Sequence, residues 1–209
     1  MTHRPIPLPC LPALLLSILA GSPATAQENQ EWDVTLARGQ TREIDFTTEE
    51  GTWLSVDISP DGRWIVFDLL GHVYRLRSDG GEAESLTQES GVAVNYHPRY
   101  SPDGEHIAFI SDRNGQNNLW IMNADGSDPA PVFTDKDVRA RTPTWTPDGE
   151  YLVVRRDYVG SGSASGNSGL WMYHRDGGAG IRLVDESGAQ WPSVSSDGQI
   201  PLLPAPKPW

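Results

Sequence analysis

A four-residue segment built around Pro, Asp and Gly recurs along the chain and restricts its fold more than any other feature. The segment stands at Ser59–Gly62, Ser101–Gly104 and Thr146–Gly149, and in a weaker form at Ser195–Gly198, with spacings of 42, 45 and 49 residues. Proline fixes the backbone angle of the second position, aspartate bonds nearby backbone N–H groups, and glycine adopts a positive φ. Each copy is therefore predicted to be a hairpin turn between two strands.

Each of the first three copies is followed by a second Asp-Gly turn, with an aromatic residue six positions before the second glycine. These aromatic residues are Tyr74, Trp120 and Trp171. Short apolar segments rich in β-branched and aromatic residues lie between the turns and are predicted to be strands. The predicted second strands are Trp64–Phe67, His106–Ile110 and Tyr151–Val154, and the third strands are Val73–Leu76, Leu119–Met122 and Leu170–Tyr173. The first strands are placed in Trp53–Ile58, Pro98–Tyr100, Pro143–Trp145 and Pro192–Val194, and the fourth in Glu84–Thr87, Ala130–Thr134 and Gly180–Val184.

Four short antiparallel strands in every 40 to 45 residues are typical of a propeller blade. The second strands are apolar on both faces, so each needs a neighbour on both sides. The sequence thus predicts an all-β fold, a β-propeller of four-stranded blades that is incomplete, with about three full blades and the start of a fourth. A β-sandwich is the alternative, but a sandwich would not require this period. The 21 Gly and 17 Pro disfavour long helices.

The first 26 residues have the pattern of a cleavable signal peptide. Arg4 precedes an apolar segment, Leu11–Ala20, and Ala24–Ala26 forms a cleavage site before Gln27. The apolar segment is shorter than the roughly 20 residues that span a bilayer. Cys10, the single cysteine, would leave with this peptide. We therefore expect a periplasmic protein without disulfides.

The rest of the chain divides at the repeat boundaries. Residues 27–52 form an N-terminal extension with an edge or closing strand in Val34–Phe46, because Arg42–Phe46 alternates in polarity. The repeats occupy residues 53–199, as units 53–96, 97–141, 142–189 and a partial unit 190–199, and a Pro-rich tail follows at 200–209. The Gly/Ser-rich segment Tyr158–Gly169 is predicted to be a loop between a second and a third strand. An incomplete ring would leave apolar faces on the first and last blades and would self-associate through open blade edges.

The charge balance excludes some classes of partner. There are 28 Asp and Glu against 16 Lys and Arg, which gives a formal net charge of −12. Nucleic acids and anionic membrane surfaces need clustered Lys and Arg, so neither is expected to bind.

Motifs for catalysis or cofactor binding are absent from the sequence. His72, His97, His106 and His174 have neither H-x-H nor H-E-x-x-H spacing, and neither a nucleophile elbow nor a G-x-G-x-x-G phosphate loop occurs. The sequence therefore predicts no catalytic residue, no cofactor and no metal, and it leaves the binding residues unknown.

The individual histidines have structural interpretations. His106 follows a turn at a position where the other repeats have Trp64 and Tyr151, so it is expected to be a packing residue. His97 at a blade entry and His72 in a turn are expected to be solvated.

Two groups of acidic residues also have structural interpretations. Asn123–Asp128 and Asp135–Asp137 could offer oxygen ligands to Ca²⁺, but the full calcium-loop pattern is absent and turn chemistry explains them. Asp68, Asp112 and Asp157 lie near the ends of the second strands. They could form a ring of carboxylates at a propeller mouth, but acceptance of backbone hydrogen bonds is the favoured interpretation.

The repeat S-P-D-G-x-x-[IL]-x-[FV], followed by an aromatic strand and D-G, resembles the propeller repeats of the TolB family, periplasmic components of Tol–Pal systems. The resemblance covers about Trp53–Gly198, and Ser111–Gly115 followed by Leu119–Gly126 is very similar to a TolB-type blade. Ala37–Gly62 and Tyr173–Gly180 also resemble large secreted bacterial proteins in which a TolB-like propeller precedes an amidohydrolase domain.

This resemblance implies a non-catalytic binding scaffold in the periplasm, which mediates protein–protein interaction or a Tol-type envelope or transport function. The alternative is the N-terminal propeller part of a larger amidohydrolase or peptidase, where it gates substrate access and the catalytic residues lie beyond Trp209. The partner would then be a downstream hydrolase domain. A third interpretation is a truncated product without a function of its own, because Ile200–Trp209 has four prolines where a strand is expected.

Overall fold

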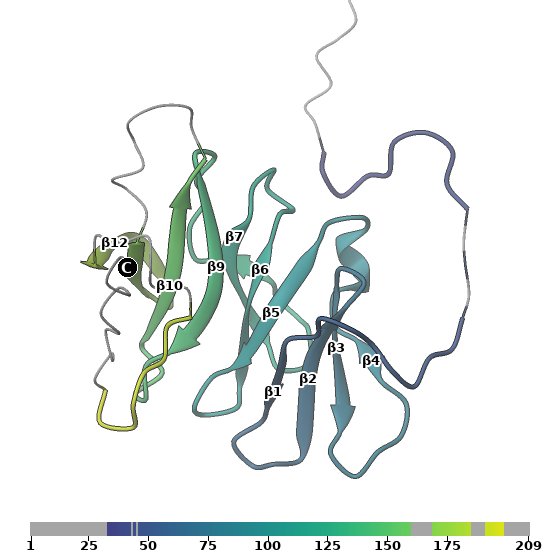
Figure 1. Cartoon of the computed structure of the whole chain (residues 1–209), viewed down its shortest axis with the longest axis horizontal. Coiled ribbons are helices and arrows are strands. Elements are labelled where there is room, and N and C mark those ends of the chain that lie inside the picture. The colour runs from purple at the N-terminus through teal and green to yellow at the C-terminus, as the bar shows by residue number, and fades with distance from the viewer. Residues whose placement is uncertain (1–32, 43, 45, 160–168, 185–190, 199–209) are drawn as a thin grey trace, which may run out of the picture. The chain divides into compact units, whose positions relative to one another are not determined.

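The computed structural model describes residues 33–42, 44, 46–159, 169–184 and 191–198, which belong to one structural unit, Asp33–Trp209. These residues form three four-stranded antiparallel sheets, each with its strands in chain order (Figure 1). This is the strand arrangement of three consecutive propeller blades, so the predicted fold class is confirmed. The predicted signal peptide, residues 1–26, lies outside the described residues.

The blades follow one another along the chain. Blade 1 consists of β1 (Val56–Ile58), β2 (Trp64–Leu69), β3 (His72–Arg77) and β4 (Glu84–Ser85), and a 3₁₀ turn, η1 (Gln88–Ser90), follows it. Blade 2 consists of β5 (Asn95–Tyr100), β6 (His106–Ser111), β7 (Asn118–Asn123) and β8 (Ala130–Pro131). Blade 3 consists of β9 (Val138–Trp145), β10 (Tyr151–Tyr158), β11 (Gly169–His174) and β12 (Gly177–Val184). No helix among the described residues is long and apolar enough to cross a membrane.

The first turn of every repeat is held by the same hydrogen bonds. In blade 1 the Ser59 hydroxyl donates to the Asp61 carboxylate at 2.6 Å, and the Gly62 N–H donates to the Ser59 carbonyl at 2.8 Å. Gly62 has φ +70°, which glycine adopts without steric cost. The Ser59 hydroxyl, followed by the backbone N–H and side chain of Arg63, lowers the pKa of Asp61 to about 2. The bonds recur at Ser101–Gly104 and Thr146–Gly149, which confirms the predicted turns.

Alternate residues of each blade point to opposite faces. We call the face toward the preceding blade the leading face and the other the trailing face. The leading face of blade 2 consists of Tyr100, Ile107, Phe109, Trp120 and Met122, which form one buried cluster with Val66, Val73 and Leu86 of blade 1. The corresponding residues of blade 3 are Trp145, Leu152, Val154, Trp171 and Tyr173, which pack with Ala108, Ile110 and Leu119 of blade 2. The second strand of blade 2 is apolar on both faces because it packs against blade 1 on one side and blade 3 on the other.

Polar side chains also join neighbouring blades. Asp57 of β1 accepts a hydrogen bond from the Tyr100 N–H of β5 at 2.9 Å, and the Trp145 indole of β9 donates to the Arg99 carbonyl of β5 at 3.1 Å. Arg75 of β3 donates to the Ala124 carbonyl, beyond β7, at 3.1 Å. These bonds fix the position of each blade relative to the next.

Three sequence predictions concerning the ends of the repeat are wrong. Val34–Phe46 forms no strand in its described residues, and Ile44 and Phe46 are 62% and 61% exposed. Its polarity alternates as expected, but no described strand edge pairs with it. Pro192–Val194 also forms no strand, although the turn after it is formed, with Gly198 N–H donating to the Ser195 carbonyl.

The third prediction concerns the last blade and is wrong for the centre of its sheet. The trailing face of blade 3 was expected to be exposed, but Val153 is 0% exposed and Leu170 is 2% exposed. On the outer strand of the same face, Ile181 is 58% exposed. The predicted Gly/Ser-rich loop joins β10 to β11, as expected, and its residues 160–168 lie outside the described residues.

Candidate functional site

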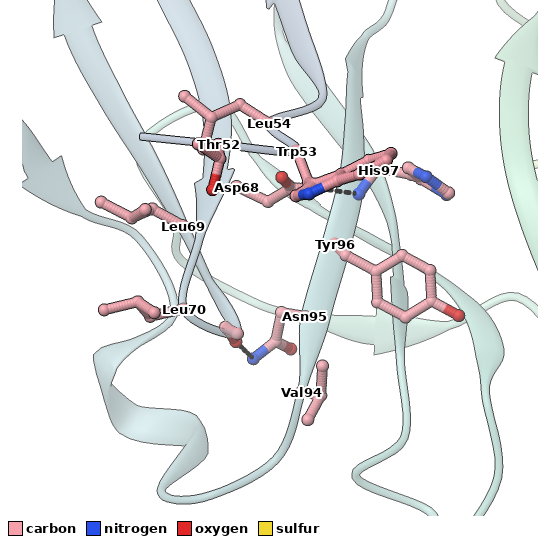
Figure 2. A pocket seen from close by; sticks show the side chains of 11 residues that line it. Thr52, Trp53, Leu54, Asp68, Leu69, Leu70, Val94, Asn95, Tyr96 and His97 are labelled. Atoms are coloured by element: carbon pink, nitrogen blue, oxygen red, sulfur yellow. Dashed lines mark hydrogen bonds between the residues drawn. The ribbon is translucent and has the colours of Figure 1, made fainter. Parts of the chain in front are cut away.

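A pocket of about 220 Å³ lies at the end of blades 1 and 2 where β2 turns into β3 (Figure 2). Its walls come from three segments: the loop entering β1, the end of β2 with its turn, and the start of β5. The lining residues are Thr52, Trp53, Leu54, Asp68, Leu69, Leu70, Gly71, Val94, Asn95, Tyr96 and His97. Large apolar side chains and polar groups both contribute to the lining.

Asp68 is the buried carboxylate of this pocket, with 8% of its surface exposed. One of its oxygens accepts the Ser55 N–H at 2.9 Å, and the other accepts the His97 N–H at 2.7 Å, the contact drawn in Figure 2. Because His97 belongs to β5, this carboxylate ties blade 1 to blade 2. Both oxygens are thus engaged by backbone donors, which suits a structural acceptor better than a general base.

His97 is half-buried against aromatic rings, so the prediction that it is solvated is wrong. Its ring lies 4.8 Å from that of Tyr96 and 5.6 Å from that of Trp191. Its Nδ1 lies 3.4 Å from the Thr142 N–H of β9, which donates to it. Burial lowers the pKa of His97 and favours the neutral imidazole, and burial raises the pKa of Tyr96 to about 12.

Backbone strain is concentrated at this pocket. The described residues other than glycine that have positive φ are Trp53, Leu70, His97, Asp128 and Thr142. Of these residues, Trp53 and Leu70 line the pocket and are 100% and 72% exposed. Residues in this region cost about 1–3 kcal/mol each and persist where the surrounding structure holds them. The fold thus holds two large apolar side chains in solvent at the rim of a pocket.

The three aspartates singled out in the sequence serve structural roles. Asp112 accepts the Val94 N–H at 2.8 Å, as Asp68 accepts that of Ser55. Asp157 instead pairs with Arg155 at 2.7 Å and with Arg141 at 3.3 Å. Acceptance of backbone hydrogen bonds is therefore confirmed for Asp68 and Asp112, and for Asp157 the partners are arginines.

The other described histidines do not line the pocket. His72 was expected in a turn but is the first residue of β3, and its Nδ1 lies 3.2 Å from the Thr87 carbonyl. His174 ends β11 and lies 3.5 Å from Glu150. His106 begins β6 and is half-buried, with the guanidinium of Arg175 2.9 Å from its ring.

One group of potential ligands was missed by the sequence motifs. Asp103, Glu105 and His106 place one ligand atom each within 4.8 Å of one another. The residue spacings of the metal-binding motifs sought in the sequence do not detect this group, because a hairpin turn brings its residues together. The Arg175 guanidinium already supplies a positive charge there, 3.8 Å from Asp103.

The two oxygen-rich segments are explained by turn and ion-pair contacts. Asp125 accepts the Ser127 N–H and hydroxyl at 2.9 and 2.6 Å. Asp135 accepts the Asp137 N–H at 2.9 Å and pairs with Arg156 at 2.6 Å. These carboxylates therefore have protein partners of the kind that turn chemistry predicts.

Comparison with known proteins agrees with this geometry. The family model of the TolB beta propeller domain matches residues 25–203. The Tol-Pal system protein TolB of Wolinella succinogenes is 26% identical over 170 residues, which cover 78% of this chain and 38% of that protein. The uncharacterized peptidase YuxL of Bacillus subtilis is 47% identical over 83 residues, which cover 39% of this chain and 12% of the peptidase. The chain thus spans less than half the length of these relatives.

Solved structures show the same fold. A putative TolB from Agrobacterium tumefaciens has a TM-score of 0.58 and 28% identity, over 68% of this chain and 54% of that one. TolB from Acinetobacter baumannii has a TM-score of 0.59 and 23% identity, over 74% of this chain and 38% of that one. The repeats, the blade structure and the family match agree, and the chain belongs to the family of TolB beta propeller domains.

Proposed function

We propose that this chain is a non-catalytic TolB-like scaffold, exported to the bacterial periplasm, that binds another protein through the pocket end of blades 1 and 2. The observation that carries the proposal is the rim of this pocket, where Trp53 is 100% exposed and Leu70 is 72% exposed. Large apolar side chains held in solvent beside a pocket are typical of protein interaction sites.

The ionisable groups of the pocket support binding rather than catalysis. Both oxygens of Asp68 accept backbone N–H groups, and His97 Nδ1 accepts the Thr142 N–H. A general acid or base needs an atom free to reach a substrate proton. The Tol–Pal name of one relative supports the envelope setting.

The second candidate is a propeller that gates access to a hydrolase active site carried elsewhere. The observation that favours it is the 47% identity to a peptidase of which this chain covers only 12%. In that case the same pocket end would face a catalytic domain of the same protein.

Photocrosslinking in cells tests the scaffold function. A photoreactive residue at Trp53 is expected to form a discrete adduct with another exported protein, and the same residue at Ile181, which is 58% exposed on β12, is expected to form none. N-terminal sequencing of the periplasmic protein should begin at Gln27. Equal adducts from both positions, or a full-length cytoplasmic product, would contradict the proposal.

Assays of the purified chain separate the two candidates. The scaffold proposal predicts no hydrolysis of amide and ester substrates and no loss of stability with a chelator. Hydrolysis that a chelator abolishes would overturn it. An adduct of Trp53 to a hydrolase domain encoded in the same reading frame would favour the gating function.

A further inference from the structure

The turn that joins β2 to β3 beside the pocket has a leucine where such turns favour other residues. Leu69 pairs with His72, so the turn has only two residues, Leu70 and Gly71. Their φ angles are +51° and +84°. Positive φ at both central positions is the geometry of a type I′ turn, which prefers asparagine, aspartate or glycine at the first of them. A leucine is strained there, because its Cβ crowds the backbone in the left-handed region.

Hydrogen bonds from blade 2 hold this turn in its strained conformation. The Gly71 carbonyl accepts the Asn95 N–H at 2.8 Å and the Asn95 side-chain amide at 3.0 Å. Asn95 is 0% exposed, and its side-chain oxygen accepts the Arg113 guanidinium at 2.9 Å. These bonds reach the backbone of Gly71, so they fix the turn without a contribution from the side chain of Leu70.

The side chain of Leu70 gains little from folding, because it is 72% exposed and buries little apolar surface. In blade 2, which lies between two described blades, the corresponding turn also has exposed residues at its tip, Asn114 and Gly115. The tips of these turns are therefore open to solvent even where a blade lies on each side. Neither packing nor the geometry of the turn accounts for a leucine at this position.

The surroundings of Leu70 favour contact with an apolar group. Figure 2 shows Leu70 and Tyr96 on opposite sides of the pocket, on blade 1 and blade 2. Asp68 and His97 are the lining residues that can be charged near neutral pH. Both oxygens of Asp68 accept backbone N–H groups, and His97 Nδ1 accepts the Thr142 N–H. The charged side chain of the lining thus has its partners within the chain.

The pocket also has room for a side chain. Its volume is about 220 Å³. A cavity of about 150 Å³ in another protein admits benzene, so a side chain of the size of leucine or phenylalanine fits here. Leucine offers no hydrogen bond, and the contact that it can make with such a group is apolar packing.

We propose that Leu70 is a binding residue, kept in a strained turn because an apolar side chain of the partner protein packs against it at the pocket. This inference rests on the proposed function, since it takes a protein to bind at the pocket end. Strain of this kind is concentrated at functional sites, and its relief commonly stabilises a protein while it weakens function. A residue suited to the turn should therefore stabilise the free chain and weaken the complex.

Two substitutions of Leu70 separate the strain from the apolar contact. Leu70→Asn gives the Asn-Gly pair that type I′ turns favour, and it should raise the melting temperature of the purified chain by about 2–4 °C. Leu70→Met keeps both the strain and an apolar side chain, so its melting temperature should be close to wild type. The control, Ile181→Asn, replaces an exposed side chain on β12 whose φ is not positive, and it should not raise the melting temperature.

The same variants are then compared for binding in cells, with the photoreactive residue at Trp53. Leu70→Asn is expected to lower the yield of the Trp53 adduct about ten-fold or more, as the loss of a buried leucine contact requires. Leu70→Met and Ile181→Asn are expected to keep the adduct. Because Leu70→Asn should be more stable than wild type, unfolding would not explain its loss of the adduct.

Three results would overturn this inference alone. The first is a Leu70→Asn chain that melts no higher than wild type, because the leucine would then not be strained. The second is a more stable Leu70→Asn chain that keeps the wild-type yield of adduct, and the third is an equal loss of adduct in Leu70→Met. Absence of a Trp53 adduct in the wild-type chain would instead overturn the proposed function, and this inference with it.

Discussion

Phe67 in blade 1 and Phe109 in blade 2 occupy the same position of the repeat, but their surroundings differ. Phe109 is 0% exposed between two blades, whereas Phe67 is half-buried on a face with no described neighbour. Both lie in a second strand after the same turn, and both pair with the aromatic residue of the third strand. The local sequence thus determines the strand, and the neighbouring blade determines how much that strand stabilises the fold.

The largest expected effect comes from truncating this pair of phenylalanines. Phe109→Ala should lower the free energy of unfolding by about 3–5 kcal/mol, because it leaves a cavity in a packed interface. Phe67→Ala should cost much less, since its site is open and loses mainly the contact with Tyr74. Urea denaturation of the two variants measures the difference. Equal losses would show that something covers blade 1 as fully as blade 1 covers blade 2.

A second pair of equivalent positions extends the comparison to the turns. Gly80 and Gly126 have φ of +96° and +90°, so alanine is strained by about 1–2 kcal/mol at either site. Only at Gly126 would the new Cβ also press on the backbone of Leu86 in the neighbouring blade. Gly126→Ala should therefore lower the melting temperature more than Gly80→Ala does. Similar melting temperatures would mean that Leu86 and its blade can shift to accommodate the new Cβ without a loss of stability.

Sequence reasoning located the features that depend on local chemistry. The Pro-Asp-Gly turns and the second and third strands were placed within a few residues, because turn residues and β-rich segments act over short distances. The prediction that aspartates near the ends of the second strands accept backbone hydrogen bonds is confirmed at Asp68 and Asp112.

What the sequence did not reveal depends on neighbours far along the chain. His97 is half-buried because the rings of Tyr96 and Trp191 lie against it, the second of them from beyond blade 3. Arg42–Phe46 has the alternation of a strand, but a strand also needs a partner edge, which no local pattern reveals. The charged Asp57 in an apolar strand is a signal in the sequence for a bond between blades.

The smallest expected effect concerns the pH dependence at the junction between blades 2 and 3. Burial lowers the pKa of His97, so the unfolded chain, with a pKa of about 6.5, binds the proton more readily than the folded chain. The stability that the neutral His97 ring contributes is therefore fully present above pH 6.5. It is lost as the pH falls from there through the pKa of His97 in the folded chain. His97→Asn keeps a residue that tolerates positive φ and should make the melting temperature less dependent on pH between 7 and 5.

The comparison for this prediction is His174→Asn, which replaces a histidine on β11 of blade 3. His97→Asn should reduce the pH dependence by the same amount in the wild-type chain and in the His174→Asn variant. If His97→Asn and wild type lose stability in parallel over this range, His97 does not stay neutral in the folded protein.

Side-chain footprinting with hydroxyl radicals tests most directly whether blade 1 lacks a neighbour. The rates are compared between equivalent residues, with the protein dilute enough to be monomeric. We expect Ile58, Phe67 and Tyr74 to be oxidised readily, and Tyr100, Phe109 and Trp120 to be protected, as their exposures of 7%, 0% and 6% require. Equal protection of the two sets in the monomer would contradict the account, because it would mean that blade 1 has a covered leading face like the others.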